Sequence, residues 1–245
     1  YVPILRRNAP LDGPAPGKPL DSLLLAIDPK TGATRWAHVR PTEAKEEAQE
    51  SYGTPVPREE GGTAEILLSG GDCVTAHDPA TGKERWRWGD WNPSRVGHWR
   101  LVPSPLAAEG LVFIPAPKKE PFIAFKPAGG GGARVWSDKA CTPDVCTPLY
   151  YQKRVYALDG DRRLLVAFDP RTGEKKATAS LPGKEVFRAS PTGADGRIWC
   201  INEDGTVSVL APEDLKILAT IPMGDKPCRA SIAAAGRQLI IRTAR

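Results

Sequence analysis

The chain has 245 residues, of which 40% are hydrophobic, and its 24 glycines and 25 prolines are typical of an all-β protein rich in turns. The formal net charge is +5, but the basic residues occur only in short pairs with no stripe of interleaved aromatic residues, which argues against nucleic-acid binding. No apolar stretch approaches the length of a membrane span, so no transmembrane segment is expected.

The earliest predicted strands, YVPILRR at 1–7 and LLLAI at 23–27, lead into a turn pattern that recurs along the chain. AIDPKTGATRW (26–36) and AHDPATGKERW (76–86) share Ala, Asp, Pro, Thr, Gly and Trp in register, and AFDPRTGEKKA (167–177) lacks only the Trp. An Asp that accepts backbone N–H groups, a Pro that fixes φ and a Gly that takes positive φ favour a tight reversal. The pattern therefore predicts a strand, a turn and an outer strand whose indole packs on the neighbouring unit.

Two weaker copies complete the series. AFKPAGGGGARVW (124–136) has Lys126 in place of the Asp and ends at Trp136, and VLAPEDLKILA (209–219) keeps Pro212. With anchors at residues 28, 78, 126, 169 and 211, the spacings are 50, 48, 43 and 42 residues. A period of this length predicts β-propeller blades of four antiparallel strands.

The remaining strands of each period are also visible in the sequence. Each innermost strand is expected near a Thr-Pro or Ser-Pro pair, followed by a second strand and a hairpin such as DGD (159–161) or NEDG (202–205). These acidic hairpins are predicted to be turns and not calcium sites, and the glycine run at 129–132 a loop and not a phosphate cradle. TEAKEEAQE (42–50) is the one helical candidate, and it is charged all round, as in a solvated connector.

The predicted domain is a single propeller spanning 1–245. Its expected blades are 1–40, 51–90, 100–138, 144–182, 187–223 and 228–245, which is about five and a half blades. Residues 1–7 read as a second strand without an innermost one, and 228–245 supply only a first and a second strand. The sequence leaves two alternatives, a fragment of a seven- or eight-bladed propeller and a six-bladed ring closed between the two ends.

The pattern Ala-x-Asp-x-x-Thr-Gly-x-x-x-Trp resembles the tryptophan-docking motif of the pyrroloquinoline-quinone-type β-propellers. This repeat family is shared by quinoprotein dehydrogenases and by the lipoprotein of the outer-membrane barrel assembly machine. Residues 26–36 and 76–86 match the motif fully, and the weaker copies extend the likeness over nearly the whole chain. The residues expected to fasten the blades are Asp28, Gly32, Trp36, Asp78, Gly82, Trp86, Trp136, Asp169 and Gly173.

The resemblance to quinoprotein dehydrogenases implies a quinone under a disulfide of adjacent cysteines, with a calcium ion and an Asp base nearby. None of the five cysteines is adjacent to another, so no cofactor is predicted, and pyrroloquinoline quinone with calcium is the alternative. Cys141 and Cys146 are spaced to close a small loop, whereas Cys73 and Cys200 fit buried free thiols. No metal-ligand spacing links the three histidines to a cysteine or to each other, and no catalytic residue is predicted.

Two arginines are the first candidates for ligand binding. The residues two positions before each Thr-Pro, Ser-Pro or matching pair are Tyr52, Val102, Val145, Arg188 and Arg229. Arg188 and Arg229 are therefore expected on adjacent inner strands, where two guanidinium groups can bind one carboxylate or phosphate. Tyr52 or Arg100 is expected at the rim of this site. The alternative is that each arginine pairs with an acidic residue and only holds the blades together.

A second candidate is the long link GDWNPSRVGHWRLVPSP at 89–105, which departs from the repeat. Trp91, His98 and Trp99, with Arg100, are of the residue types that recognition loops use to contact a glycan or a peptide. The alternative is that the link only covers the edge of a blade.

The predicted function is a non-catalytic binding or scaffold module of the bacterial cell envelope, whose partner is a protein, a glycan or a small anionic ligand. A periplasmic, cell-envelope or extracellular location is implied by the resemblance alone. The main alternatives are a quinone-dependent oxidoreductase and a propeller domain whose catalytic partner lies elsewhere in a larger enzyme. A sugar-binding propeller is a third possibility.

Overall fold

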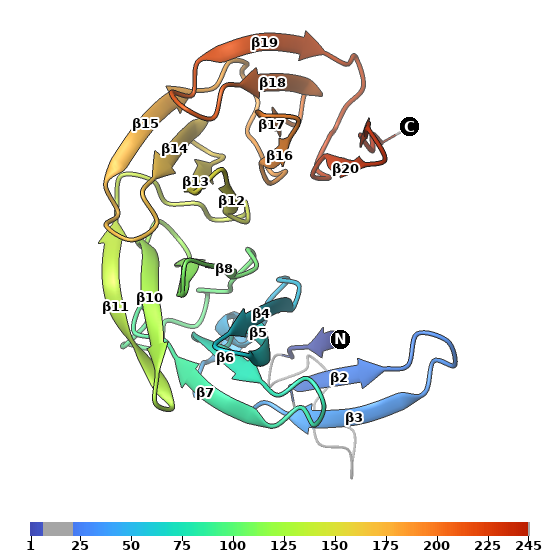
Figure 1. The fold of residues 1–245 in the computed structure, drawn as a ribbon, viewed down its shortest axis with the longest axis vertical. Helices are drawn as coiled ribbons and strands as arrows, with labels where there is room; N and C mark the ends of the chain where they lie inside the picture. The colour runs from blue at the N-terminus through green and yellow to red at the C-terminus, as the bar shows by residue number, and fades with distance from the viewer. Residues whose placement is uncertain (7–21, 245) are drawn as a thin grey trace. The chain divides into compact units, whose positions relative to one another are not determined.

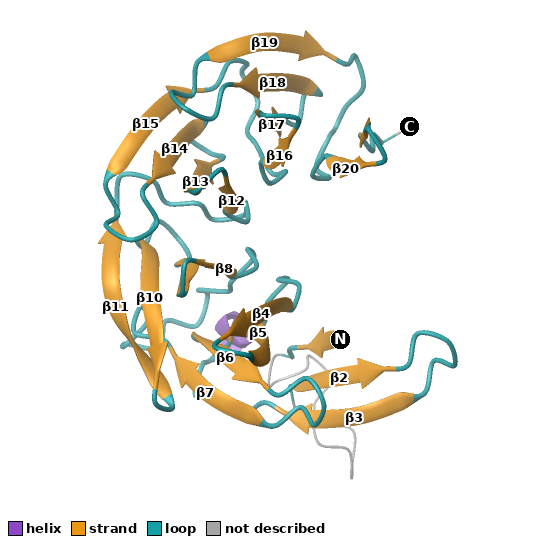
Figure 2. Ribbon diagram, in the orientation of Figure 1, coloured by secondary structure: helices purple, strands orange, loops and turns teal. Residues whose placement is uncertain are grey.

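The fold is built almost entirely from β-strands. The structure is a computed structural model that describes residues 1–6 and 22–244. Figure 2 shows strands and loops throughout this part of the chain, with a short helix in purple, η1 (Glu46–Gln49). The predicted all-β class is therefore confirmed. No helix among the described residues is both long and apolar enough to cross a membrane.

The strands form sheets in the sequence order of a β-propeller, and four of these sheets contain four strands (Figure 1). The predicted four-stranded blades are thus confirmed. The first four-stranded sheet contains β4 (Val56–Glu60), β5 (Thr63–Gly70), β6 (Cys73–His77) and β7 (Glu84–Trp88), and the second contains β8 (Leu106–Ala108), β9 (Leu111–Pro115), β10 (Phe122–Ala128) and β11 (Gly131–Asp138). The third contains β12 (Leu149–Tyr151), β13 (Arg154–Asp159), β14 (Leu164–Phe168) and β15 (Lys175–Ser180). The fourth contains β16 (Thr192–Ala194), β17 (Arg197–Ile201), β18 (Thr206–Leu210) and β19 (Ile217–Pro222).

Two smaller sheets come from the two ends of the described chain. One has three strands, β1 (Val2–Ile4), β2 (Leu23–Ile27) and β3 (Thr34–Val39), and the other has two, β20 (Ala233–Ala235) and β21 (Gln238–Ile240). The chain divides into two compact units, Tyr1–Val112 with Phe125–Ala133, and Phe113–Ala124 with Arg134–Arg245.

The Thr-Pro and Ser-Pro pairs have a role that the sequence does not reveal. Each pair directly precedes an innermost strand, and in three places the hydroxyl of a pair, or of the matching Ser231, accepts a backbone N–H from the pair of the preceding blade. In the second unit the Thr147 N–H donates to Ser190 Oγ (2.9 Å) and the Ser190 N–H donates to Ser231 Oγ (2.9 Å). In the first unit the Thr54 N–H donates to Ser104 Oγ (2.8 Å). These bonds connect the innermost strands of successive blades.

The Asp-Pro-x-Thr-Gly turns share one local geometry. Asp28 Oδ1 accepts the N–H groups of Lys30 (2.9 Å) and Thr31 (3.2 Å), and the same two bonds recur at Asp78 and Asp169. The closing glycine has positive φ, which a residue with a Cβ rarely adopts, at +74° in Gly32, +76° in Gly82 and +73° in Gly173. The turn therefore depends on the Asp side chain and on the absence of a side chain at the Gly.

Two tryptophans of the repeat lie against the turn of the next blade. Trp36 Nε1 donates to the Pro79 carbonyl (3.2 Å), and a Cβ on Gly82 would lie 2.5 Å from the indole. Trp136 Nε1 donates to the Pro170 carbonyl (2.9 Å), and a Cβ on Gly173 would lie 2.6 Å from its ring. The turn glycine therefore makes room for the indole as well as closing the turn.

Trp86 is placed differently, because the next repeat has no Asp-Pro-x-Thr-Gly turn to receive it. Its Nε1 donates to Glu65 Oε1 (3.1 Å), and its ring packs edge-on against Phe125 at 5.9 Å between centroids.

The glycine run at 129–132, predicted as a loop, forms a shorter loop than expected. Gly129 and Gly130 take positive φ, whereas the two glycines that follow already belong to β11.

A tyrosine makes the same bond in the blade that lacks the tryptophan. Tyr156 on β13 pairs with Ala167, which pairs with Ala177, so the three side chains share one face of the sheet. Tyr156 Oη donates to the Pro212 carbonyl (2.9 Å), the position that corresponds to Pro79 and Pro170 in the other turns. Tyr1 Oη donates to the Pro79 carbonyl in the same way (3.1 Å).

We expect Tyr156→Phe to lower the free energy of unfolding by about 1 kcal/mol, as for loss of one buried hydrogen bond. Arg154 also donates to the Pro212 carbonyl (3.3 Å), so this oxygen keeps one partner in the variant. Urea unfolding of the parent and the variant measures the change. Tyr52→Phe is the matched control, because its hydroxyl is exposed and its bond to Glu50 is long (3.4 Å). An equal loss in both variants would contradict the assignment.

Candidate functional site

Arg188 and Arg229 each carry an ion pair with an acid from the preceding hairpin of the second unit. Arg188 Nη1 lies 2.8 Å from Asp161 Oδ1, and Arg229 Nε lies 2.8 Å from Glu203 Oε1. Backbone hydrogen bonds join the same segments. The Phe187 N–H donates to the Gly160 carbonyl, and the Cys228 N–H donates to the Glu203 carbonyl (3.0 Å each). These contacts favour the alternative in which the arginines hold successive blades together.

Tyr52 and Arg100, predicted at the rim of the same site, belong to the first unit. Tyr52 is 62% exposed, and its hydroxyl donates to Glu50 Oε2 (3.4 Å). Arg100 Nη1 pairs with Glu47 Oε1 of η1 at 2.8 Å. Nearby, Ala48 and Gln49 are buried, and the Gln49 amide donates to the Ala44 carbonyl (2.8 Å). The segment predicted to be a solvated connector therefore packs against its own unit through part of η1.

The link at 89–105 is anchored by Trp91, one of the residues predicted to contact a partner. Trp91 is only 4% exposed and packs edge-on against Trp88 at 6.0 Å between centroids. It lies in the interior of the first unit and not on a recognition surface, because its large apolar ring fills space beside the end of β7. His98 is exposed and Trp99 is half-buried, so these two remain available at the surface.

All five cysteines are free and buried, so Cys141 and Cys146 are not joined to each other. The Cys141 Sγ donates to the Ala157 carbonyl (3.4 Å) and the Cys146 Sγ donates to the Ala189 carbonyl (3.3 Å). Burial raises the pKa of Cys141 to about 12 and that of Cys200 to about 12. Cys141, Cys146 and Cys200 are therefore protonated core residues.

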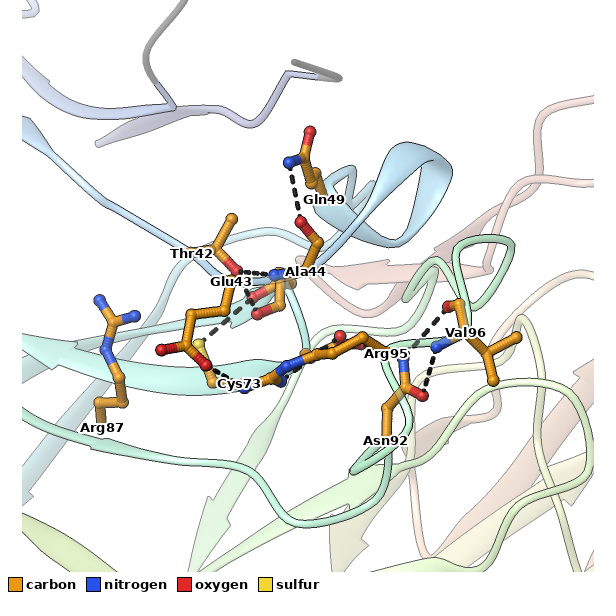
Figure 3. A network of polar contacts seen from close by, with 12 residues as sticks. Thr42, Glu43, Ala44, Gln49, Cys73, Arg87, Asn92, Arg95 and Val96 are labelled. Atoms are coloured by element: carbon orange, nitrogen blue, oxygen red, sulfur yellow. Dashed lines mark hydrogen bonds and ion pairs between the residues drawn. The ribbon is translucent and has the colours of Figure 1, made fainter. Parts of the chain in front are cut away.

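A polar cleft in the first unit is a further candidate site. It has a volume of about 550 Å³ and lies where the β5–β6 hairpin, the end of β7 and the link after β3 meet (Figure 3). Its lining residues are Pro41, Thr42, Glu43, Gly71, Asp72, Cys73, Arg87, Trp88, Gly89 and Arg95.

The hairpin that forms one wall requires a glycine. Gly71 and Asp72 connect β5 to β6 with φ of +61° and +59°, as a two-residue hairpin of this handedness needs. Thr42 Oγ1 donates to the Gly71 carbonyl (2.7 Å), and a Cβ on Gly71 would lie 2.7 Å from the same hydroxyl oxygen. The close approach of backbone and hydroxyl fixes the link to the hairpin.

Charged side chains of both signs line the opening. In Figure 3 the Arg95 side chain extends toward Glu43, and the ion pair between Nη2 and Oε2 is 2.6 Å long. Asp72 accepts a hydrogen bond from Asn92 Nδ2 (2.8 Å) and lies 3.6 Å from Arg95 Nη1. Burial raises the pKa of Asp72, and Asn92 and Arg95 oppose that shift. Arg87 holds Glu84 through two bonds and donates to the Pro41 carbonyl (2.7 Å).

A buried arginine lies beneath this cleft. Arg40 is 1% exposed and donates from Nε to Thr75 Oγ1 (2.8 Å) and from Nη2 to the Cys73 carbonyl (3.1 Å) and Sγ (3.2 Å). Its Nη1 is buried without a hydrogen-bond partner in the described part of the chain. A buried guanidinium is unusual because its charge loses hydration, and the surroundings must replace that hydration.

The polar chain continues from Arg40 to the turn that receives Trp36. His77 Nε2 lies 2.8 Å from Thr75 Oγ1, and His77 Nδ1 lies 2.9 Å from the Gly82 carbonyl. Because a carbonyl only accepts, Nδ1 carries the proton, and Nε2 of the neutral ring accepts from the Thr75 hydroxyl. Burial lowers the pKa of His77 to about 4, and the Arg40 charge works in the same direction.

We expect His77 to make stability depend on pH. Its pKa is about 4 in the folded chain against 6.5 without the fold, so the unfolded state binds more protons between these values. The neutral His77 ring contributes on the order of 3 kcal/mol to the free energy of unfolding. This contribution is complete above pH 6.5 and is lost as the pH falls toward 4. Urea unfolding at several pH values measures this slope. His77→Gln should flatten it relative to the parent, and an unchanged slope would contradict the assignment.

The cleft is suited to binding a polar group. Arg87 and Arg95 supply donors, Glu43 supplies acceptors, and Trp88 contributes an indole whose ring stacks on Phe125 at 4.1 Å between centroids. No three His, Cys, Asp or Glu side chains gather as metal ligands anywhere in residues 1–6 or 22–244. Sequence reasoning missed this cleft, although its Gly-Gly-Asp-Cys hairpin and the charged link of 42–50 stand out in the sequence.

Comparisons with known proteins bear on the fold and family. BamB from Moraxella catarrhalis is 15% identical over 88% of this chain and 64% of its own, with a TM-score of 0.62. Quinohemoprotein alcohol dehydrogenase from Comamonas testosteroni is 16% identical over 84% of this chain and 41% of its own, also at 0.62. The computationally designed Ika8 protein is 13% identical over 87% of this chain and 60% of its own, at 0.62.

The chain thus spans less than two thirds of each of these structures, and at such identities the likeness shows the fold alone. No curated protein matches the chain. A family model described as outer membrane protein assembly factor BamB matches residues 20–183 and 123–227, which overlap and together cover most of the sequence. The chain is therefore a member of this family of pyrroloquinoline-quinone-type propeller repeats.

Proposed function

We propose that the chain is a non-catalytic binding module of the bacterial cell envelope, which presents a propeller surface to a protein partner. The observation that carries the proposal is the family match across residues 20–183 and 123–227, because the family is described as an assembly factor for outer membrane proteins. An assembly factor acts by holding other proteins, and the side chains of the cleft fit such a role because they offer hydrogen-bond donors and acceptors at its opening.

The proposed contact surface is the cleft of the first unit with its charged rim. The Glu43 side chain is 84% exposed although it pairs with Arg95, so a partner can exchange this ion pair for one of its own. Trp88 and Arg87 belong to residue types that contribute strongly to protein interfaces. Under this proposal two kinds of contact keep successive blades in place, so that the surface is rigid. They are the contacts of Trp36 and Trp136 with the turn of the next blade and the ion pairs of Arg188 and Arg229. Small anions and glycans are weaker candidates for the partner.

The proposal includes no cofactor. The quinone site of the related dehydrogenases is implied to need adjacent cysteines, and the five cysteines of this chain are separated in sequence and individually buried as free thiols. A purified sample incubated with pyrroloquinoline quinone and calcium tests the alternative directly. A visible absorbance band that stays with the protein through gel filtration, together with dehydrogenase activity, would replace the binding module with an oxidoreductase.

Site-specific photo-crosslinking in the bacterial host tests the binding proposal. A photoreactive amino acid at Glu43 should give a discrete crosslink to an envelope protein, whereas the same residue at Glu174 should not. Glu174 is the matched control because it is also exposed (64%) and paired, with Lys176, but belongs to the second unit and is not a lining residue of the cleft. Crosslinks of equal pattern from both positions, or none to any envelope protein, would contradict the proposal.

A further inference from the structure

The buried Arg40 guanidinium lacks a carboxylate to balance its charge. Arginine stays protonated in proteins, and a buried charge is normally paired with an opposite one. Among residues 1–6 and 22–244, no Asp or Glu oxygen forms an ion pair or hydrogen bond with Arg40. Glu84, which feels the Arg40 charge, is held through both of its oxygens by Arg87. The positive charge therefore needs another counter-charge nearby.

The Cys73 sulfur is the ionisable group that Arg40 touches. The distance from Arg40 Nη2 to Cys73 Sγ is 3.2 Å, shorter than the 3.6 Å from the sulfur to the Gly70 carbonyl. A thiolate accepts hydrogen bonds and is stabilised by an adjacent guanidinium. Cys73 differs from Cys141 and Cys146 in this guanidinium contact, because the hydrogen bonds of the other two sulfurs go to backbone carbonyls, which favour the protonated thiol.

Cys73 also lines the cleft. Cys73 is 6% exposed and borders the space of about 550 Å³, whereas Cys141 and Cys200 have no exposed surface. The preceding residue, Asp72, also lines the cleft and has an oxygen that is buried without a hydrogen bond among the described residues and lies 3.6 Å from Arg95 Nη1. The Cys73 thiol therefore lies beside the buried, uncompensated Arg40 guanidinium and borders a space that small molecules can enter.

We infer that Cys73 is ionised against Arg40 and is a modification site at which small hydroperoxides react. The thiolate sulfur attacks the terminal oxygen of the hydroperoxide, an S–O bond forms and the O–O bond breaks. The sulfur becomes a sulfenic acid by a two-electron oxidation, and the hydroperoxide is reduced to an alkoxide or hydroxide, which takes a proton from water. A cellular thiol condenses with the sulfenic acid to form a mixed disulfide and water, and a second thiol then reduces this disulfide, which releases the Cys73 thiolate and a disulfide of the two cellular thiols.

The site also has a consequence for the cleft. Ionised Cys73 neutralises Arg40, and oxidation to the uncharged sulfenic acid removes this counter-charge beneath the Gly71-Asp72 hairpin. The inference does not depend on the partner proposed above, because it concerns the chemistry of one sulfur in the free chain.

Two measurements on the native, unmodified chain test the ionisation. Iodoacetamide at neutral pH, followed by peptide mapping, should alkylate Cys73 at least about tenfold faster than Cys146 and Cys200, because the thiolate is the reacting form. Subtracting the ultraviolet spectrum of Cys73→Ser from that of the parent at the same pH should leave the absorbance band of one thiolate. A difference spectrum without this band would overturn the inference, even if Cys73 is alkylated.

Variants of the cation separate charge from exposure. Arg40→Gln removes the charge while leaving Cys73 at the cleft, so alkylation should slow by about tenfold and the thiolate band should disappear. Arg40→Lys keeps a positive charge and should retain most of both signals, and it serves as the second test should the Gln variant fail to fold. Equal alkylation rates in the parent and a folded Gln variant would overturn the inference.

Hydroperoxide reactivity is tested separately. Brief treatment of the native chain with hydrogen peroxide, followed by a dione probe that traps sulfenic acids, should label Cys73 and leave Cys146 and Cys200 unlabelled. Labelling should be lost in Cys73→Ser. Absence of the adduct at Cys73 under conditions where iodoacetamide reacts would overturn the assignment of hydroperoxides as the substrate. A failed crosslink from Glu43 would leave all these readouts unchanged, so the two proposals fail independently.

Discussion

Replacing Trp136 with alanine is expected to lower the free energy of unfolding by about 3 kcal/mol, the lower end of the usual cost of removing a large aromatic side chain, because the indole is half-buried. The indole stacks on Phe168 at 5.5 Å, packs edge-on against Phe122 at 5.6 Å and covers Gly173. It also donates a hydrogen bond to the Pro170 carbonyl, which loses that partner in the variant. Denaturant unfolding, followed by circular dichroism, measures the loss.

Two variants show whether this loss in the free energy of unfolding comes from the contact of Trp136 with the next blade. Trp136→Phe keeps a ring on Phe168 and Phe122 but lacks the N–H, so its loss should be clearly smaller than that of the alanine variant. Trp99 in the link of the first unit is half-buried like Trp136 but makes no ring contact or side-chain hydrogen bond among the described residues, so Trp99→Ala should cost less than Trp136→Ala. Equal losses for Trp99→Ala and Trp136→Ala would show that this contact has no special role.

Gly160→Ala should cost about 3 kcal/mol or more, because the added Cβ would overlap a backbone atom that has little freedom to move. A Cβ on Gly160 would collide with the Phe187 carbonyl oxygen, and the Phe187 N–H donates to the Gly160 carbonyl (3.0 Å). The contact therefore has to open, and with it the link between the fourth and fifth blades. Hydrogen exchange at the Phe187 amide should accelerate along with the loss of stability.

Gly131→Ala is the matched control for this prediction. Gly131 has negative φ like Gly160, and its added Cβ would meet only the Arg87 carbonyl oxygen at 3.7 Å, an ordinary contact. We expect a change of less than about 1 kcal/mol there, set mainly by the flexibility that glycine gives the unfolded chain. If both glycine variants unfold at the same denaturant concentration, the close approach of Gly160 to Phe187 is not rigid.

The repeat fold was predictable because its turns are specified locally. Asp78 and Gly82 act within a few residues of each other, through bonds to backbone N–H groups and through positive φ, so a short motif is enough to place a reversal. The spacing of such reversals then predicts the four-stranded blades that the structure contains. The joint made by Tyr156 was not predictable in this way, because it depends on which residues share a row across three strands.

The candidate site was less accessible to sequence reasoning. The acids that pair with Arg188 and Arg229 lie in the preceding hairpins, 27 and 26 residues away, so no local pattern joins them. Arg40 follows an outer strand that is otherwise exposed, and its burial arises only because the β5–β6 hairpin and the link after β3 close over it. A charged residue at a strand end normally predicts a solvated side chain, which is why the cleft above it was missed.

The shared proline carbonyl has a consequence for how such repeats diverge. Pro79 accepts a bond from both Trp36 and Tyr1, whereas Pro212 receives one from Tyr156 in a blade whose outer strand has Ala177 instead of a tryptophan. A main-chain oxygen is present whatever the side chain, so mutation cannot delete the acceptor, and two different strands can supply the donor. A duplicated blade that has both donors can lose either one without separating from its neighbour. Copies of the repeat can therefore drift beyond recognition by motif while their junctions persist, which allows a chain such as this one to keep the fold at 15% identity.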